Sequence, residues 1–151
     1  MAETKRFHIV IAEDNYADVI LVREAFKMHG LEPEVAVITD GEEAIRHFRS
    51  LDLDSRSTVP DLVLLDMHLP KHDGTAILAA IRSTNRCAET PVIVMTSSDL
   101  PYGWQNSKKH AALYYFHKSS SLTEFMNLGL IVRRILSETK SPVDTGRTGG
   151  M

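Results

Sequence analysis

The sequence is poor in cysteine, and Cys87 is its one thiol. A single cysteine forms no internal disulfide, so the composition argues against a small disulfide-stapled extracellular domain. Long apolar runs are also missing, and no stretch approaches the ~20 apolar residues that span a bilayer. A charged start followed by an apolar segment, which would mark a signal peptide, is not found either. These absences predict a cytoplasmic protein with no membrane partner.

An excess of positive charge is the next thing missing. The chain has 17 basic and 20 acidic residues, giving a net charge of -3. No basic excess exists to neutralise a run of phosphates, so nucleic acid is excluded as an expected partner. Hydrophobic residues make up 43% and charged residues 25% of the 151 residues, the balance of one soluble globular domain.

What the sequence does contain is a regular alternation of apolar runs and amphipathic stretches. Apolar runs predict strands at residues 7–12, 34–38, 62–65, 91–95 and 113–117, buried on both faces. Helical spacing of apolar residues predicts helices at residues 16–29, 42–51, 75–83, 101–111 and 122–136, the first capped by Gly30. Five such units predict a doubly wound parallel sheet with helices on both faces, since parallel neighbours need right-handed helical crossovers.

The C-terminal end of the chain carries no such pattern of apolar residues. Residues 139–151 are rich in Thr, Ser, Pro and Gly without apolar periodicity, which predicts a flexible C-terminal tail. We therefore expect one domain over residues 6–138 and no output domain after it.

Chemically useful side chains follow the predicted strands. Glu13 and Asp14 come after the first strand, Asp66 closes the third, Thr96 follows the fourth and Lys118 the fifth. If strand one lies beside strand three, three carboxylates converge at one edge of the sheet. They then repel one another unless a hard cation offsets them, and oxygen ligands of this kind suit Mg²⁺. The Thr96 hydroxyl and the Lys118 ammonium suit phosphoryl oxygens, which leaves Asp66 as the nucleophile.

Each of these residues also has a plainer explanation when taken alone. An acidic pair after a strand often only favours the start of a helix, and a lone lysine is usually a solvated surface charge. The combined order at successive strand ends is hard to reach by chance, so the constellation favours a functional site. The seven histidines show no zinc-ligand spacing.

Five motifs in order resemble the receiver domain of bacterial response regulators, of the kind exemplified by the chemotaxis regulator. They are IAEDN at 11–15, LLDMHLP at 64–70, DG at 73–74, PVIVMT at 91–96 and YFHK at 115–118. The resemblance implies a flavodoxin-like receiver fold with strand order 2-1-3-4-5. It also implies a Mg²⁺ site formed by Glu13, Asp14, Asp66 and the backbone carbonyl of His68, with Asp66 accepting phosphate from a sensor histidine kinase.

The resemblance further implies a switch. Thr96 would move toward the phosphoryl oxygens as Tyr115 packs inward, and the surface of the fourth helix, fifth strand and fifth helix would report the change. The usual proline after Lys118 is replaced by Ser119, which leaves open whether that peptide is cis. The long loop before strand three and the Lys-Ser pair are similar to single-domain regulators that serve phytochrome-type histidine kinases.

Several functions remain in competition. A phosphorelay receiver is the main prediction: a protein consumed as a substrate, not a turnover enzyme, which passes its phosphate onward if a phosphotransfer protein is a partner. A Mg²⁺-dependent phosphohydrolase also uses an aspartate at a strand end, but it needs a second acid where this chain has His68. A scaffold that signals without phosphate is the third. A homodimer through the last helix is predicted from Leu128, Ile131 and Ile135.

Overall fold

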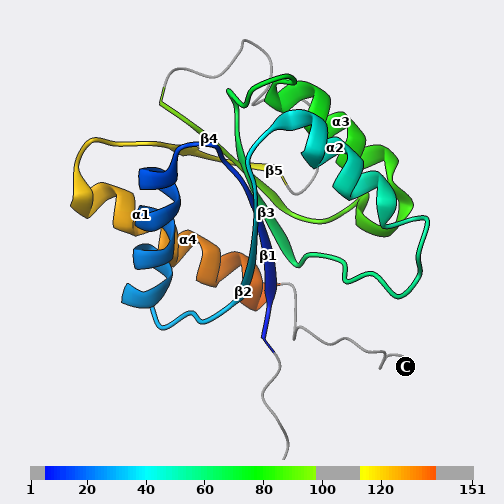
Figure 1. Cartoon of the computed structure of the whole chain (residues 1–151). Helices are drawn as coiled ribbons and strands as arrows, with labels where there is room; N and C mark the ends of the chain where they lie inside the picture. Colours follow the sequence, from blue (N-terminus) through cyan, green and yellow to red (C-terminus); the bar gives the residue numbers. More distant parts are fainter. Residues whose placement is uncertain (1–5, 98–112, 139–151) are drawn as a thin grey trace, which may run out of the picture.

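The computed structural model describes residues 6–97 and 113–138, and a five-stranded parallel sheet lies at its centre (Figure 1). The strands are β1 (His8–Ala12), β2 (Glu34–Ile38), β3 (Leu62–Asp66), β4 (Val92–Thr96) and β5 (Leu113–His117). Their order across the sheet is β2-β1-β3-β4-β5, with every neighbouring pair parallel. The predicted fold class, strand order and neighbouring of β1 and β3 are therefore confirmed.

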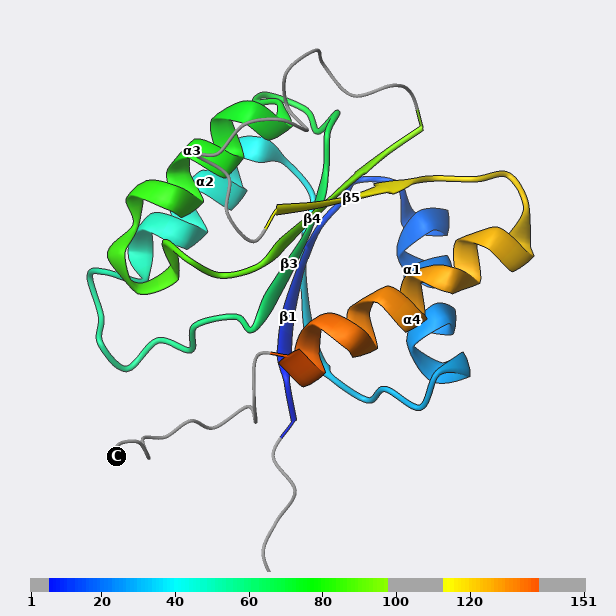
Figure 2. The ribbon, with the colours of Figure 1, turned by 180° about the vertical axis from the view of Figure 1, so that it is seen from behind.

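Helices cover both faces of this sheet (Figures 1 and 2). One face carries α1 (Tyr16–Met28) and α4 (Leu122–Glu138), and the other carries α2 (Gly41–Ser50) and α3 (Gly74–Ser83). A short 3-10 helix, η1 (Asn85–Cys87), precedes β4 and was not predicted. The helix predicted at residues 101–111 and the tail at residues 139–151 lie outside the described residues. The label α4 thus belongs to the helix predicted as the fifth.

Burial differs between the middle and the edges of the sheet. Every position of β3 and β4 is buried, as two covered faces require. The prediction of strands buried on both faces is wrong for β2, whose Glu34, Ala36 and Val37 are exposed, and for β5, which has one fully buried position. Both are edge strands, so a run of apolar residues alone overstated how far they are covered.

Helix α1 has a defined start and end. The Asn15 side chain caps it by accepting a hydrogen bond from the Asp18 backbone N–H. At the other end, Gly30 has a φ of 74°, and the amides of Gly30 and Leu31 donate to the carbonyls of Lys27 and Phe26. This is a Schellman motif, which favours glycine at the left-handed position. The predicted glycine cap is confirmed, and the helix ends one residue earlier than predicted.

Helices α1 and α4 lie against each other without a gap. A Cβ atom added at Gly129 of α4 would collide with the carbonyl oxygen of Ala25 of α1. The His29 Nε2 donates to the carbonyl of Met126 at 3.1 Å, and Arg133 Nη1 donates to the carbonyl of His29 at 2.9 Å. The two helices therefore form one layer, held by packing and by hydrogen bonds between them.

This layer removes the basis for the predicted dimer. Leu128 and Ile135 are buried in the core beneath α4, and Ile131 packs against the same core. The prediction that these side chains lie open to a second copy is wrong for Leu128 and Ile135, whereas Ile131 is half-buried. Leu122 and Leu130 are the exposed aliphatic residues of this helix.

Two further expectations concern the backbone and the membrane. None of the described peptide bonds is cis, so the bond that follows Lys118 is trans. Among the described helices, none combines the length and the apolar character needed to cross a membrane.

Candidate functional site

The three predicted carboxylates meet at the carboxyl ends of β1 and β3. Glu13 and Asp14 follow β1, Asp66 is the last residue of β3, and the register pairs Ala12 with Leu65 just before them. One carboxylate oxygen from each of the three acids lies within 4.8 Å of the others. Glu13 is 1% exposed and Asp66 is 6% exposed, whereas Asp14 is open to solvent. The convergence predicted from the sequence is present.

Lys118 enters this group from the end of β5. Its Nζ atom lies 2.8 Å from Glu13 Oε1, 2.8 Å from Asp18 Oδ2 and 3.6 Å from Asp66 Oδ1. One ammonium group thus stands among three carboxylates. The backbone N–H of Lys118 donates to the carbonyl of Thr96 at 2.8 Å, which links the end of β5 to the end of β4.

The loop after Lys118 is held by serine side chains. The Ser119 hydroxyl donates to Glu124 at 2.6 Å and accepts from the Ser121 backbone N–H at 2.9 Å. The Ser121 hydroxyl in turn accepts from the Glu124 backbone N–H at 3.3 Å. The last of these bonds satisfies the Glu124 amide in the first turn of α4, as a capping residue does, so Lys118 leads into a fixed helix start.

The two residues predicted to switch are both in place in the sheet. Thr96 ends β4, is buried and pairs in register with His117. Tyr115 lies in the middle of β5, half-buried, and packs against the core between the sheet and helices α2 and α3. Burial raises the pKa of its hydroxyl. The two residues therefore occupy neighbouring strands, with Thr96 at the carboxyl end of its strand, where the acidic cluster lies.

His68 is near the site through its backbone. Its N–H donates to Asp66 Oδ1 at 3.2 Å, and the N–H of Met67 donates to the carbonyl of Met95 at 3.1 Å. The chain therefore folds back over the carboxylate immediately after β3. The predicted role of the His68 carbonyl as a metal ligand stays a prediction.

The electrostatics of the site show an excess of negative charge around one cation. Burial raises the pKa of Glu13 to about 7, against the hydrogen bond from Lys118, and the charge of Asp66 adds to the rise. Burial by itself would lower the pKa of Lys118, but its bonds to Asp18 and Glu13 outweigh burial and raise it. The ammonium is therefore firmly charged, while one carboxyl is poised near neutral pH.

Such a set of groups fits a hard divalent cation. All three candidate side-chain ligands offer carboxylate oxygens, the donors that Mg²⁺ prefers. Lys118 brings one positive charge among the carboxylates of Glu13, Asp18 and Asp66, and a cation would offset negative charge that this ammonium leaves uncompensated. Glu13, Asp14 and Asp66 are therefore the residues that would hold the metal.

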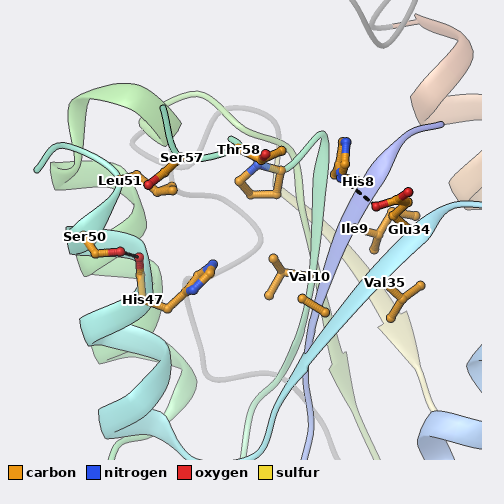
Figure 3. Close-up of a pocket in the computed structure, with 12 residues that line it drawn as sticks. His8, Ile9, Val10, Glu34, Val35, His47, Ser50, Leu51, Ser57 and Thr58 are labelled. Carbon is orange, nitrogen blue, oxygen red and sulfur yellow. Dashed lines mark hydrogen bonds and ion pairs between the residues drawn. The ribbon is translucent and has the colours of Figure 1, made fainter. Parts of the chain in front are cut away.

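The hollow drawn in Figure 3 lies elsewhere. Its cavity volume is about 360 Å³, and its lining includes His8, Glu34 and His47. His8 and Glu34 begin β1 and β2, so the hollow opens at the amino ends of the strands. There the His8 Nδ1 lies 3.9 Å from Glu34 Oε1, and both side chains are well exposed (Figure 3). The hollow takes no part in the acidic site.

A doubly wound sheet that presents an acidic cluster and a lysine at its carboxyl edge defines the receiver class of signalling domain. The chain belongs to the response regulator receiver domain family, whose profile matches residues 9–128. It is therefore a receiver domain of two-component signalling.

Particular relatives agree with this assignment. The response regulator Rcp1 of Synechocystis is 33% identical over 120 residues, covering 80% of this chain and 78% of that protein. The crystal structure of the phosphorylated cyanobacterial phytochrome response regulator RcpA aligns with a TM-score of 0.77 at 32% identity, covering 92% of this chain and 100% of that one. The Mn²⁺-bound form of Rcp1 aligns with a TM-score of 0.67 at 28% identity, covering 93% and 99%. That metal-bound structure and the carboxylate cluster together support a divalent metal site here.

Sequence reasoning missed Asp18. This residue lies in the first turn of α1 and places Oδ2 at 2.8 Å from Lys118 Nζ, as close as Glu13 does. An acid in the first turn of a helix is already explained by the helix dipole, so its position carried no separate signal. Only the approach of β5 to the start of α1 reveals its partner.

Proposed function

We propose that Asp66 accepts a phosphoryl group from a sensor histidine kinase in a Mg²⁺-dependent reaction. One observation carries the proposal: the Asp66 side chain, 8% exposed, ends a strand beside Glu13 and Asp14 and lies 3.6 Å from the Lys118 ammonium. A nucleophilic carboxylate needs groups that neutralise charge on the incoming phosphoryl oxygens. The acidic cluster would hold a cation that supplies one positive charge there, and Lys118 supplies a second.

The transfer exchanges one bond to phosphorus for another. An oxygen of Asp66 forms a P–O bond as the P–N bond to the kinase histidine breaks, and the imidazole leaves with that electron pair. Lys118 and the Thr96 hydroxyl donate to the phosphoryl oxygens. A bound Mg²⁺ supplies positive charge at the same oxygens. The receiver is consumed as a substrate, although its own side chains assist phosphorylation and the later loss of phosphate.

We further propose that the phosphoryl group is reported through Thr96 and Tyr115. Movement of the Thr96 hydroxyl toward the phosphate makes room for Tyr115 to pack inward, which changes the surface of β5 and α4; the fourth predicted helix, also expected on this surface, lies outside the described residues. A change of this kind needs only a two-state element that a new charge biases. The Lys118 N–H bond to the Thr96 carbonyl supports it, because the backbone there already links the two strands.

The partners follow from the same family. Similarity to the phytochrome response regulator RcpA supports a phytochrome-type histidine kinase as the phosphate donor. A phosphotransfer protein is proposed as the next acceptor, and the cytoplasm as the place of the exchange. We do not propose a homodimer through α4, because Leu128 and Ile135 are buried and offer no surface to a second copy.

The test is the intact-protein mass after exposure to a small phosphoryl donor with Mg²⁺. We expect the native protein to gain one phosphoryl group, and Asp66→Asn or a chelated sample to gain none. Asp54→Asn is the matched control, since Asp54 lies in the exposed loop before β3 and should leave labelling unchanged.

Two outcomes would contradict the proposal. Labelling of Asp66→Asn at the native level would place the acceptor elsewhere. No gain in any sample, with Mg²⁺ binding established separately, would favour a scaffold that signals without phosphate.

A further inference from the structure

We propose that Asp18 is a positioning residue, which keeps the Lys118 ammonium away from Asp66 until a phosphoryl group arrives. This inference rests on the proposed phosphorylation of Asp66 and goes beyond it by assigning a role to a fourth carboxylate. In the unphosphorylated protein Asp18 competes with Asp66 for the Lys118 ammonium. Asp18 thereby sets how strongly the site attracts the phosphoryl group.

The distances around Lys118 show this competition. Hydrogen bonds from an ammonium nitrogen to a carboxylate oxygen are ~2.7 to 2.9 Å long. The contacts to Glu13 and Asp18 are both 2.8 Å, whereas the contact to Asp66 is 3.6 Å. Lys118 therefore donates to the first two acids and only approaches the third. The side chain that would stabilise the phosphoryl group is engaged with Asp18 instead.

Asp18 is held firmly enough to act in this way. Its backbone N–H donates to Asn15 Oδ1 at 3.1 Å, and the Asn15 N–H donates to Glu13 Oε2 at 3.1 Å. Glu13 and Asp18 thus belong to one hydrogen-bonded segment at the start of α1. The Asp18 side chain is 21% exposed and that of Lys118 is 13% exposed, so water screens their attraction only in part.

Asp18 also differs from the other acids in what can relieve its charge. The group of potential metal ligands consists of Glu13, Asp14 and Asp66, and Asp18 is not a member. A cation in that group weakens the hold of Glu13 and Asp66 on Lys118 but leaves Asp18 as its main anionic partner. The phosphoryl group must then draw the ammonium from Asp18, which lowers the affinity of the resting site for it.

The test uses beryllofluoride with Mg²⁺ as a stand-in for the phosphoryl group on the full chain, with affinity measured by calorimetry. We expect Asp18→Asn to bind about three- to tenfold more tightly than the native protein, the range of a partly exposed ion pair. Glu24→Gln is the control: it removes the same charge from the same helix, where Glu24 pairs with the exposed Lys27. It should bind like the native protein.

A double-mutant cycle separates positioning from a general loss of negative charge. In a Lys118→Ala background the effect of Asp18→Asn should disappear, because no ammonium remains to be released. An equal gain in that background would overturn the proposal in favour of a field effect. Unchanged or weaker binding in Asp18→Asn would also overturn it. Asp18→Glu should return affinity toward the native value.

The control measurements keep the two proposals apart. If the native protein binds no beryllofluoride, the phosphoacceptor role of Asp66 fails and this inference falls with it. If the native protein binds but Asp18→Asn shows no gain, only the role of Asp18 fails. Asp18→Ser provides a second neutral side chain in case the amide introduced by Asp18→Asn itself bonds to Lys118.

Discussion

The two ends of the sheet carry charged side chains in opposite circumstances. At the carboxyl ends, Glu13 and Asp66 are buried, and the Lys118 Nζ, on a side chain only 13% exposed, lies within 4 Å of both carboxylates. At the amino ends, His8 and Glu34 form a 3.9 Å pair whose side chains are 41% and 58% exposed. Water screens the second pair and hardly reaches the first.

A short distance between opposite charges is therefore a poor guide to how much a pair matters to the protein. Both ends place an acid beside a base. Burial decides whether removing one partner leaves the other as an uncompensated charge inside the protein. The carboxyl end should therefore respond strongly to every change of charge, and the amino end should hardly respond.

The largest effect should come from Glu13→Gln. Loss of one of the three carboxylate ligands should weaken Mg²⁺ binding on the order of a hundredfold. Glu34→Gln at the amino end removes the same charge and should leave the affinity within about twofold. Calorimetric titration of both variants with Mg²⁺ measures this difference, and equal losses would refute the contrast between the ends.

Next in size is the removal of Lys118. Lys118→Met should destabilise the metal-free protein by about 2 kcal/mol, because Glu13 and Asp66 then lack a cation inside the fold. His8→Gln at the other end should cost less than about 0.5 kcal/mol. Urea unfolding of the three proteins, with and without Mg²⁺, tests the prediction. Mg²⁺ should restore more stability to Lys118→Met than to the native protein.

A third effect depends on pH. Burial raises the pKa of Glu13 to about 7, so the acid is increasingly protonated below that pH. Metal ligands must be deprotonated, and Mg²⁺ affinity should therefore rise up to pH 7 and level off above it. Below pH 7 the fall should approach about tenfold per pH unit, and it should be much smaller in Glu13→Gln. A pH-independent affinity between 5.5 and 8 would contradict the assignment.

The smallest effect is expected at His47, beside the hollow at the amino ends. Burial lowers its pKa, so the folded protein takes up this proton less readily than the unfolded chain. His47 therefore lowers the free energy of unfolding slightly as the pH falls through the range in which histidines titrate. NMR titration should place its midpoint below that of an exposed histidine. A midpoint above the ordinary value would show that a nearby acid outweighs burial.

The carboxyl edge of the sheet could be predicted well from the sequence, because each strand places its own residue there independently of the others. Apolar runs located every described strand to within about a residue, and Glu13, Asp66 and Lys118 follow those strands directly. Once the order of parallel strands is known, residues at their carboxyl ends must converge. The acidic cluster was thus accessible from spacing and topology alone.

The rest depended on contacts between elements. Asp18 meets Lys118 across a separation of 100 residues, and a first-turn acid has an adequate local explanation. The apolar residues of α4 are buried because Gly129 allows the helix to approach α1 closely, which helical periodicity does not reveal. The exposure of β2 likewise follows from its place at the edge of the sheet. Side-chain partners across the fold were therefore the part that sequence reasoning could not supply.

The close contact at Gly129 joins the backbones of α1 and α4, and it should make the two helices open together. Helices that touch backbone to backbone open only together, so amide hydrogens in α1 and α4 should exchange with solvent late and at similar rates. Asp18 lies on α1, and Lys118 leads directly into α4. Brief local openings elsewhere in the domain would then leave the backbone that carries both residues in place, so that the Lys118 side chain changes partners on a fixed backbone.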